Sequence, residues 1–249
     1  MSTVNRILFE PNEIDASGVA RVRDARAAHI REVLHGTVGQ PLKTGEVNGL
    51  LGTGEIVSIA ADGTVAIQVR HTDAGLAPWV DLLLAPPRPR VMKRLLPQLA
   101  TLGVGRIVLV GAQKVEKDFW GATLLKEPIY RPLLIDGLMQ GAVASRVPEI
   151  LVRRGFKKFV REELDGLFGT AARRIVAHPY GDGAACAQTP SGRGAEGRLV
   201  LAVGPEGGWT DEEVALLEAK GFERQSLGPR ILRTDTATVA LLARLMPDR

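Results

Sequence analysis

Short apolar runs separated by glycines fill the first seventy residues of the chain. This spacing is typical of short strands joined by tight turns. We predict strands over residues 6–9, 41–47, 54–60 and 64–69, and one helix over residues 25–34. Strands of this kind around a single helix predict a small β-barrel.

The pattern changes after residue 80, where near-continuous apolar runs alternate with segments of helical spacing. The runs predict strands that are buried on both faces, over residues 80–85, 106–110, 150–152, 175–177 and 199–203. Between several of them, helices are predicted over residues 91–102, 156–168 and 211–219. Buried strands alternating with helices indicate an α/β fold with a mostly parallel sheet.

One segment of small residues separates these two regions, and another interrupts the second region. Residues 72–78 are small, polar and broken by Pro78, which is typical of a linker. We therefore predict a first domain over residues 1–72 and a second over residues 78–249. Residues 181–197, rich in glycine, alanine and serine, predict a mobile loop before the last buried strand.

The composition bears on the location of the protein and on whether it holds a disulfide or a metal. The chain contains no apolar run of about eighteen residues and no signal-peptide layout at its start, so we expect a cytoplasmic protein with no membrane partner. Cys186 is the single cysteine, and the four histidines lack metal-site spacing. We expect no disulfide and no metal.

Charge is spread unevenly along the chain. The net charge is +4, yet residues 1–74 hold seven Lys and Arg against nine Asp and Glu. The basic remainder fits a polyanionic partner such as nucleic acid, and it fits an ordinary solvated surface equally well.

The first glycine loop, residues 204–208, follows the predicted strand 199–203 and reads Gly204-Pro205-Glu206-Gly207-Gly208. Three glycines at the carboxyl end of a buried strand let a ligand approach the backbone closely. Thr210 and Glu213 have capping-box spacing and predict the start of a helix. The Walker and dinucleotide-binding spacings of glycine are missing.

The second glycine loop begins at Gly228 and runs to residue 237, before an apolar helix that extends to about residue 246. Ile231 and Leu232 are aliphatic residues in a loop, where they could form a flat slot for a purine ring. The alternative is that both loops are tight connections and that Ile231 and Leu232 pack under the last helix.

Together the loops resemble the ribosomal RNA small subunit methyltransferase E family. The resemblance rests on residues 204–208 and on Leu227-Gly228-Pro229-Arg230-Ile231-Leu232-Arg233-Thr234-Asp235-Thr236-Ala237. It extends to segments 29–34, 102–107 and 177–179. His35, Asp235 and the segment 139–142 depart from the family pattern.

The resemblance implies a fold, an activity and partners. The family has an amino-terminal PUA-like β-barrel and a SPOUT α/β domain with a trefoil knot. Its members are homodimers that use S-adenosylmethionine to methylate N3 of a uridine in 16S rRNA of the small ribosomal subunit.

Site residues follow from the motifs. The expected cofactor-binding residues are His178, Pro179, Val203, Gly204, Pro205, Glu206, Gly208, Leu227, Gly228, Ile231 and Leu232. Arg233 is the candidate cation that stabilises a uridine anion, because its planar fork suits a delocalised charge. Asp235 could accept the N3 proton, orient Arg233, or act as a helix N-cap. Glu206 could hold the cofactor ammonium, act in a dimer, or favour the following helix.

Candidate RNA contacts in the first domain are Arg6, Arg21, Arg23, Arg26, His29 and Arg31. Lys114, Lys117, Arg146, Lys157 and Lys158 could extend the track. Each of these side chains could equally be a solvated surface group.

Two other functions remain open at this point. One is a SPOUT enzyme that methylates a ribose 2′-hydroxyl in rRNA or tRNA. The other is a non-catalytic RNA-binding assembly factor. A dinucleotide-dependent oxidoreductase is remote, because the glycine fingerprint is missing.

Overall fold

The computed structural model describes residues 6–169, 172–179 and 198–247. Its contacts form two compact units, one of Met1–Ala77 with Leu134–Val147 and one of Pro78–Leu133 with Pro148–Arg249. The sequence places residues 134–147 in the second domain, whereas the structure packs them in the first unit. The predicted loop at residues 181–197, with Cys186, lies outside the described residues.

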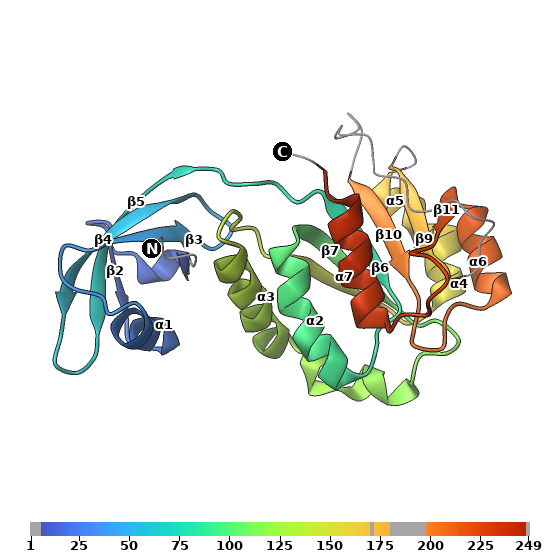
Figure 1. The fold of residues 1–249 in the computed structure, drawn as a ribbon, viewed down its shortest axis with the longest axis horizontal. Helices are drawn as coiled ribbons and strands as arrows, with labels where there is room; N and C mark the ends of the chain where they lie inside the picture. The colour runs from blue at the N-terminus through green and yellow to red at the C-terminus, as the bar shows by residue number, and fades with distance from the viewer. Residues whose placement is uncertain (1–5, 170–171, 180–197, 248–249) are drawn as a thin grey trace. The chain divides into compact units, whose positions relative to one another are not determined.

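The first unit contains a five-stranded sheet in the order β1-β3-β4-β5-β2 (Figure 1). Its strands are β1 (Ile7–Phe9), β2 (Val19–Val22), β3 (Pro41–Glu46), β4 (Leu51–Ile59) and β5 (Val65–Asp73). β1 pairs with β3 in parallel, and the other pairs are antiparallel. Inward-facing side chains such as Phe9, Ile30 and Ile67 are fully buried and form its core.

The predicted helix of this unit is divided. An α-helical turn, α1 (Ala25–Ala28), continues into a π-helical turn, η2 (His29–Val33), and a 3-10 turn, η1 (Pro11–Glu13), precedes β2. Asp24 caps α1 through a hydrogen bond from the Arg26 backbone N–H.

Arg6 fastens residues 134–147 to the sheet of the first unit. Its Nε donates to the Ala142 carbonyl over 2.9 Å, and its Nη1 donates to the carbonyls of Thr44 (2.5 Å) and Gly52 (2.9 Å). Partial burial lowers the pKa of the Arg6 guanidinium. Ser145 adds a hydrogen bond to the Gly49 carbonyl.

The second unit contains six strands in the order β11-β9-β10-β6-β7-β8, and every neighbouring pair is parallel. The strands are β6 (Val80–Leu84), β7 (Val104–Val110), β8 (Glu149–Arg153), β9 (Arg174–Ala177), β10 (Leu199–Val203) and β11 (Phe222–Gln225). β6 and β10 are buried along their whole length, as their apolar runs predict. The predicted α/β class is confirmed.

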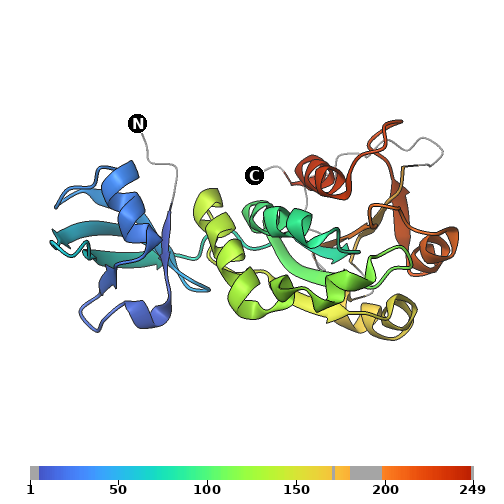
Figure 2. The same ribbon diagram turned by 90° about the horizontal axis from the view of Figure 1, so that it is seen from below.

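Helices cover both faces of this sheet (Figures 1 and 2). α2 (Pro89–Thr101) packs against α7 (Thr234–Leu245) on one face. The other face carries the nearly continuous α4 (Phe156–Lys158), η5 (Phe159–Glu163) and α5 (Leu164–Phe168), together with α6 (Asp211–Glu218). The 3-10 turns η3 (Lys117–Gly121) and η4 (Thr123–Leu125) precede α3 (Glu127–Gly141).

Parallel strands place all their following loops at one edge of a sheet. The loops after β6, β7, β9, β10 and β11 therefore share the carboxyl edge, with β10 between β9 and β6. Both glycine loops belong to this edge. Among the described residues, no helix has the length and apolar character needed to cross a membrane, and no cluster of three or more potential metal ligands occurs.

Candidate active site

A cavity of about 440 Å³ lies at the carboxyl edge of the second unit's sheet, between the two glycine loops. Cofactor sites are commonly cavities of this size. Every residue that the sequence predicts for the cofactor lines it: His178, Pro179, Val203, Gly204, Pro205, Glu206, Gly208, Leu227, Gly228, Ile231 and Leu232. The structure thus brings together residues that follow or end three separate strands, β9, β10 and β11.

The first glycine loop needs two of its glycines for different reasons. A β-carbon on Gly204 would lie 3.1 Å from the Trp209 ring, so a side chain there would displace the ring or the loop. Gly208 has φ +72°, a left-handed conformation that favours glycine, and its N–H closes a turn on the Pro205 carbonyl over 2.8 Å.

Glu213 holds the end of this loop. Its carboxylate accepts from the Thr210 N–H (2.9 Å), which completes the predicted capping box, and from the Gln113 N–H (2.7 Å). The side chain is buried, so these bonds satisfy a carboxylate that would otherwise be costly to bury. α6 and the loop after β7 are joined at this point.

The second glycine loop presents its apolar side chains outward. Ile231 is 72% exposed and Leu232 38% exposed, which excludes the alternative that both pack under the last helix. Gly228 has φ +109°, and its N–H donates to the Ser226 hydroxyl over 3.1 Å. The loop is shorter than predicted, because α7 begins at Thr234.

One buried hydrogen bond links the two glycine loops. The Thr234 hydroxyl donates to the Gly204 carbonyl over 3.3 Å, and the Thr238 hydroxyl donates to the Thr234 carbonyl over 2.6 Å. Both threonines are buried. The first turn of α7 is therefore tied to the end of β10.

Sequence reasoning missed two important residues of the cavity wall. Trp209 is 6% exposed and packs against Phe156 with ring centroids 5.3 Å apart. Its Nε1 is buried and has no hydrogen-bond partner in the described part of the chain. Lys114, predicted only as an RNA contact, also lines the cavity and donates to the Gly207 carbonyl over 2.9 Å. Trp209 directly follows Gly208, so the sequence carried a signal for it, whereas the contact of Lys114 with Gly207 joins residues far apart in the chain.

The predicted catalytic residues lie at the start of α7, and neither lines the cavity, although their neighbours Leu232 and Thr234 do. Arg233 is exposed at the N-cap position. Asp235 accepts from the Thr236 N–H over 2.9 Å and lies 3.9 Å from Arg94. Arg233, and not Asp235, holds the N-cap position, so the N-cap alternative for Asp235 is excluded.

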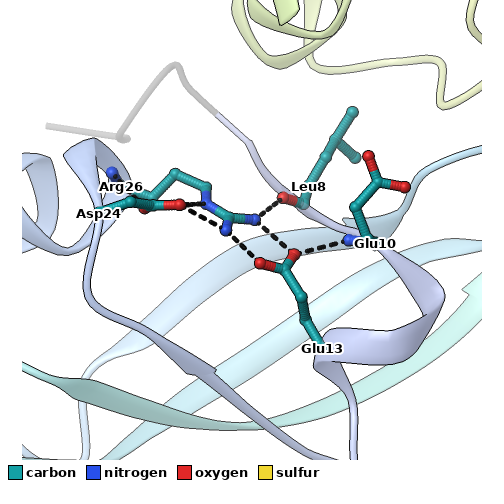
Figure 3. A network of polar contacts seen from close by, with 5 residues as sticks. All are labelled: Leu8, Glu10, Glu13, Asp24 and Arg26. Carbon is teal, nitrogen blue, oxygen red and sulfur yellow. Dashed lines mark hydrogen bonds and ion pairs between the residues drawn. The ribbon is translucent and has the colours of Figure 1, made fainter. Parts of the chain in front are cut away.

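Arg26 of the first unit is occupied within the protein (Figure 3). Its guanidinium pairs with Glu13 (2.5 Å) and Asp24 (2.6 Å) and donates to the Leu8 carbonyl (2.8 Å). Burial opposes its charge, but these carboxylates outweigh that effect and raise the pKa of Arg26. The hydrogen bond from Arg26 lowers the pKa of Glu13 and the pKa of Asp24. Because its guanidinium binds groups of its own unit, Arg26 has a structural role.

The other predicted RNA contacts of the first unit differ in exposure. Arg6 is also engaged internally, as described above. Arg23, with Asp62 at 3.5 Å, Arg21, in an ion pair with Asp15, and Arg31, 3.8 Å from Glu32, carry exposed guanidinium groups. His29 has a buried Nε2 atom without a partner in the described residues.

Comparisons with known proteins agree with this architecture. Residues 76–246 match the model of a family described as the RNA methyltransferase domain. Ribosomal RNA small subunit methyltransferase E of Treponema pallidum is 31% identical over 245 residues, which span 96% of this chain and 90% of that protein. The same-named protein of Aquifex aeolicus is 29% identical over 159 residues, or 63% of each chain.

A solved structure has the same fold. It is ribosomal RNA small subunit methyltransferase E from Neisseria gonorrhoeae, bound to S-adenosyl methionine, with a TM-score of 0.71, 21% identity and coverage of 96% of this chain and 95% of that one. The fold and the family model together define an RNA methyltransferase. Within that class, the chain belongs to the ribosomal RNA small subunit methyltransferase E family.

Proposed function

We propose that the protein transfers a methyl group from S-adenosylmethionine to N3 of a uridine in 16S rRNA of the small ribosomal subunit. The observation that carries the proposal is the cavity between the two glycine loops, whose wall contains all eleven predicted cofactor residues. The family's name and the bound ligand of the Neisseria gonorrhoeae protein support the choice of substrate and donor.

The cavity fits the chemical groups of the donor. An adenine ring needs an apolar slot and polar backbone groups at its edge, and Val203, Leu227 and Leu232 lie beside exposed loop backbone. The buried Nε1 of Trp209 lacks an acceptor in the described residues, and a ligand in this cavity could supply one. Glu206, which lines the same wall, could pair with the donor's ammonium.

The reaction imposes two demands on the protein. When bound, S-adenosylmethionine supplies a sulfonium methyl and leaves as a neutral thioether. Uridine N3 must lose its proton to an acceptor before or as it bonds to the methyl carbon, and the negative charge on the ring needs a cation nearby. We assign the cation to Arg233 and the proton acceptor to Asp235.

RNA docking is proposed for the exposed arginines of the first unit, Arg21, Arg23 and Arg31, and for His29. Arg6 and Arg26 are omitted, because their donors are engaged inside the unit. The first unit would then correspond to the family's PUA-like RNA-binding barrel, and the second to a SPOUT domain with a trefoil knot.

Two further properties belong to the same proposal. We infer a homodimer formed through the second unit, and a cytoplasmic location where ribosomal subunits assemble. Light scattering of the purified protein at several concentrations tests the dimer. A mass equal to one chain at all concentrations would exclude it.

Product analysis tests the activity. Small subunits from a strain that lacks the protein are incubated with enzyme and isotopically labelled S-adenosylmethionine, and the rRNA is digested to nucleosides for mass spectrometry. We expect label in N3-methyluridine. Label in a 2′-O-methyl nucleoside would favour the ribose enzyme, and absence of saturable donor binding would favour a non-catalytic factor.

A variant tests the catalytic assignment. Arg233→Ala should lower turnover by about 10³-fold, because one charge-stabilising donor is lost, while the Kd for S-adenosylmethionine changes little. Turnover that stays near the wild-type rate would remove Arg233 from the mechanism.

A further inference from the structure

A second cavity, of about 140 Å³, lies beside the first at the carboxyl edge of the sheet. It is bounded by the loop after β6, the loop after β7 and the first glycine loop. Most of the larger cavity's wall comes from the loops after β9, β10 and β11. Its volume is about a third of the larger one. A single ring suits it better than a whole nucleotide.

The two cavities share one thin wall. Lys114, Pro205, Glu206 and Gly207 line both of them. At Gly207 a β-carbon would lie 3.0 Å from the Lys114 side chain, so the wall there consists of backbone and one aliphatic stem. A methyl donor bound on one side of this loop and a methyl acceptor bound on the other would therefore lie close together.

Arg88 is held at the second cavity by carboxylates. Its Nε donates to Glu116 over 2.9 Å and lies 3.9 Å from Glu206. The hydrogen bond to Glu116, together with the charge of Glu206, raises the pKa of Arg88. These contacts use Nε, and within the described part of the chain no hydrogen bond of the two Nη groups occurs, so they can serve as a fork for a ligand.

The backbone around Arg88 is restricted as well. Arg88 is the N-cap residue of α2, with φ −49° and ψ 147°, and it lies between Pro87 and Pro89. A residue before proline is confined to extended conformations. The position of the arginine is therefore set by the chain and by its carboxylate partners.

The first two turns of α2 carry exposed cations, Arg90, Lys93 and Arg94, and no acid in the first turn. A cation in the first turn of a helix, such as Arg90, is opposed by the helix dipole. α6 follows the usual rule, with three acids in its first turn. An anionic ligand would favour the basic arrangement of α2, because the dipole and the cations both attract phosphate.

We propose that the second cavity receives the target uracil, that Arg88 binds a carbonyl oxygen of its ring, and that the cations of α2 hold the adjoining phosphate. The inference rests on the proposed methyl transfer and names the site of its acceptor. Arg88 adds a cation to the ring's anion beyond Arg233, and it makes N3 deprotonation easier.

Two variants and a matched control test this site. At saturating donor, Arg88→Ala should lower turnover on small subunits by about 10²-fold, and Arg88→Lys by about 10-fold, since lysine keeps the charge and loses the fork. The Kd for S-adenosylmethionine should stay within about twofold of wild type, because the arginine binds the acceptor. Arg153→Ala is the control: Arg153 forms an ion pair with Glu163 over 2.6 Å and lines neither cavity, so turnover should not change.

A pH profile separates binding chemistry from a merely structural role. Without Arg88 the uracil anion is less stabilised, so the rise of turnover with pH should shift to higher pH in Arg88→Ala and much less in Arg88→Lys. A structural defect would lower turnover without moving the profile.

A binding experiment needs no methyl donor. Crystals of the protein soaked with uridine 5′-monophosphate should show the ring in the second cavity with an oxygen on Arg88. A ring bound elsewhere, or full turnover by Arg88→Ala with normal donor binding, would overturn this inference alone. Failure of the wild-type protein to bind S-adenosylmethionine would instead overturn the proposed function.

Discussion

The glycine loops of the second unit differ from Arg6 and Arg26 of the first unit in how far their binding groups are satisfied within the protein. Ile231 and Leu232 remain exposed beside a cavity, and Trp209 keeps a buried donor without a protein partner in the described chain. Arg6 and Arg26 direct their donors at carbonyls and carboxylates of their own unit. Polar and apolar groups without a partner in the protein indicate a ligand site, whereas groups with internal partners indicate a structural role.

The largest expected effect tests the framework side of this comparison. Arg26→Ala should lower the free energy of unfolding by about 3 kcal/mol, because Glu13 and Asp24 lose a partly buried partner. Urea denaturation measures the change. Arg23→Ala is the matched control: its guanidinium is 70% exposed with Asp62 at 3.5 Å, so it should cost no more than about 0.5 kcal/mol. Equal effects of the two variants would break the comparison.

The next effect tests the ligand side. Gly204→Val should weaken S-adenosylmethionine binding by about 30-fold, or about 2 kcal/mol, because the new side chain meets Trp209 and distorts the first glycine loop. Calorimetry measures the Kd. Gly166→Ala serves as control, since a β-carbon there meets nothing within 4 Å, and it should bind like wild type.

A smaller effect concerns acid stability. The hydrogen bond from Arg26 lowers the pKa of Glu13 from its ordinary 4.5, so its contribution to stability is complete above that value and is lost as the pH falls through the lowered pKa. Unfolding free energies of wild type and Arg26→Ala should therefore converge as the pH falls below 4.5. A constant difference down to pH 2 would contradict this linkage.

The smallest effect concerns RNA. Alanine at Arg21, Arg23 or Arg31, one at a time, should weaken binding of small-subunit rRNA about threefold and reduce the salt slope by about one. Arg26→Ala, measured where it is fully folded, should leave the slope unchanged. A loss of slope in Arg26→Ala would show that this arginine reaches phosphate after all.

The parallel sheet and the cofactor cavity were predictable for the same physical reason. Strands such as β6 and β10 are apolar throughout because both faces are covered, and glycines such as Gly204 and Gly208 stand where backbone geometry requires them. These properties are local in sequence. The cavity's residue list could be assembled from two motifs and the ends of two strands once the family resemblance assigned these segments to the methyl donor.

Other elements depend on partners that are distant in the sequence, so the pattern of residues did not predict them. β2 was missed because it has only four residues and Arg21 interrupts its apolar run. α3 was missed because it contains Pro132 within the helix and lacks a clear apolar stripe. The packing of residues 134–147 in the first unit depends on hydrogen bonds from Arg6, which spacing cannot reveal. The same reason explains why the partners of Arg26 and the neighbours of Arg88 were not foreseen.

A crystal structure of the protein with S-adenosylmethionine tests the central claim most directly. We expect one donor molecule per chain between the first and second glycine loops, with its adenine against Leu227, Ile231 and Leu232. Donor bound at another place, or a cavity that stays empty at saturating concentration, would contradict it.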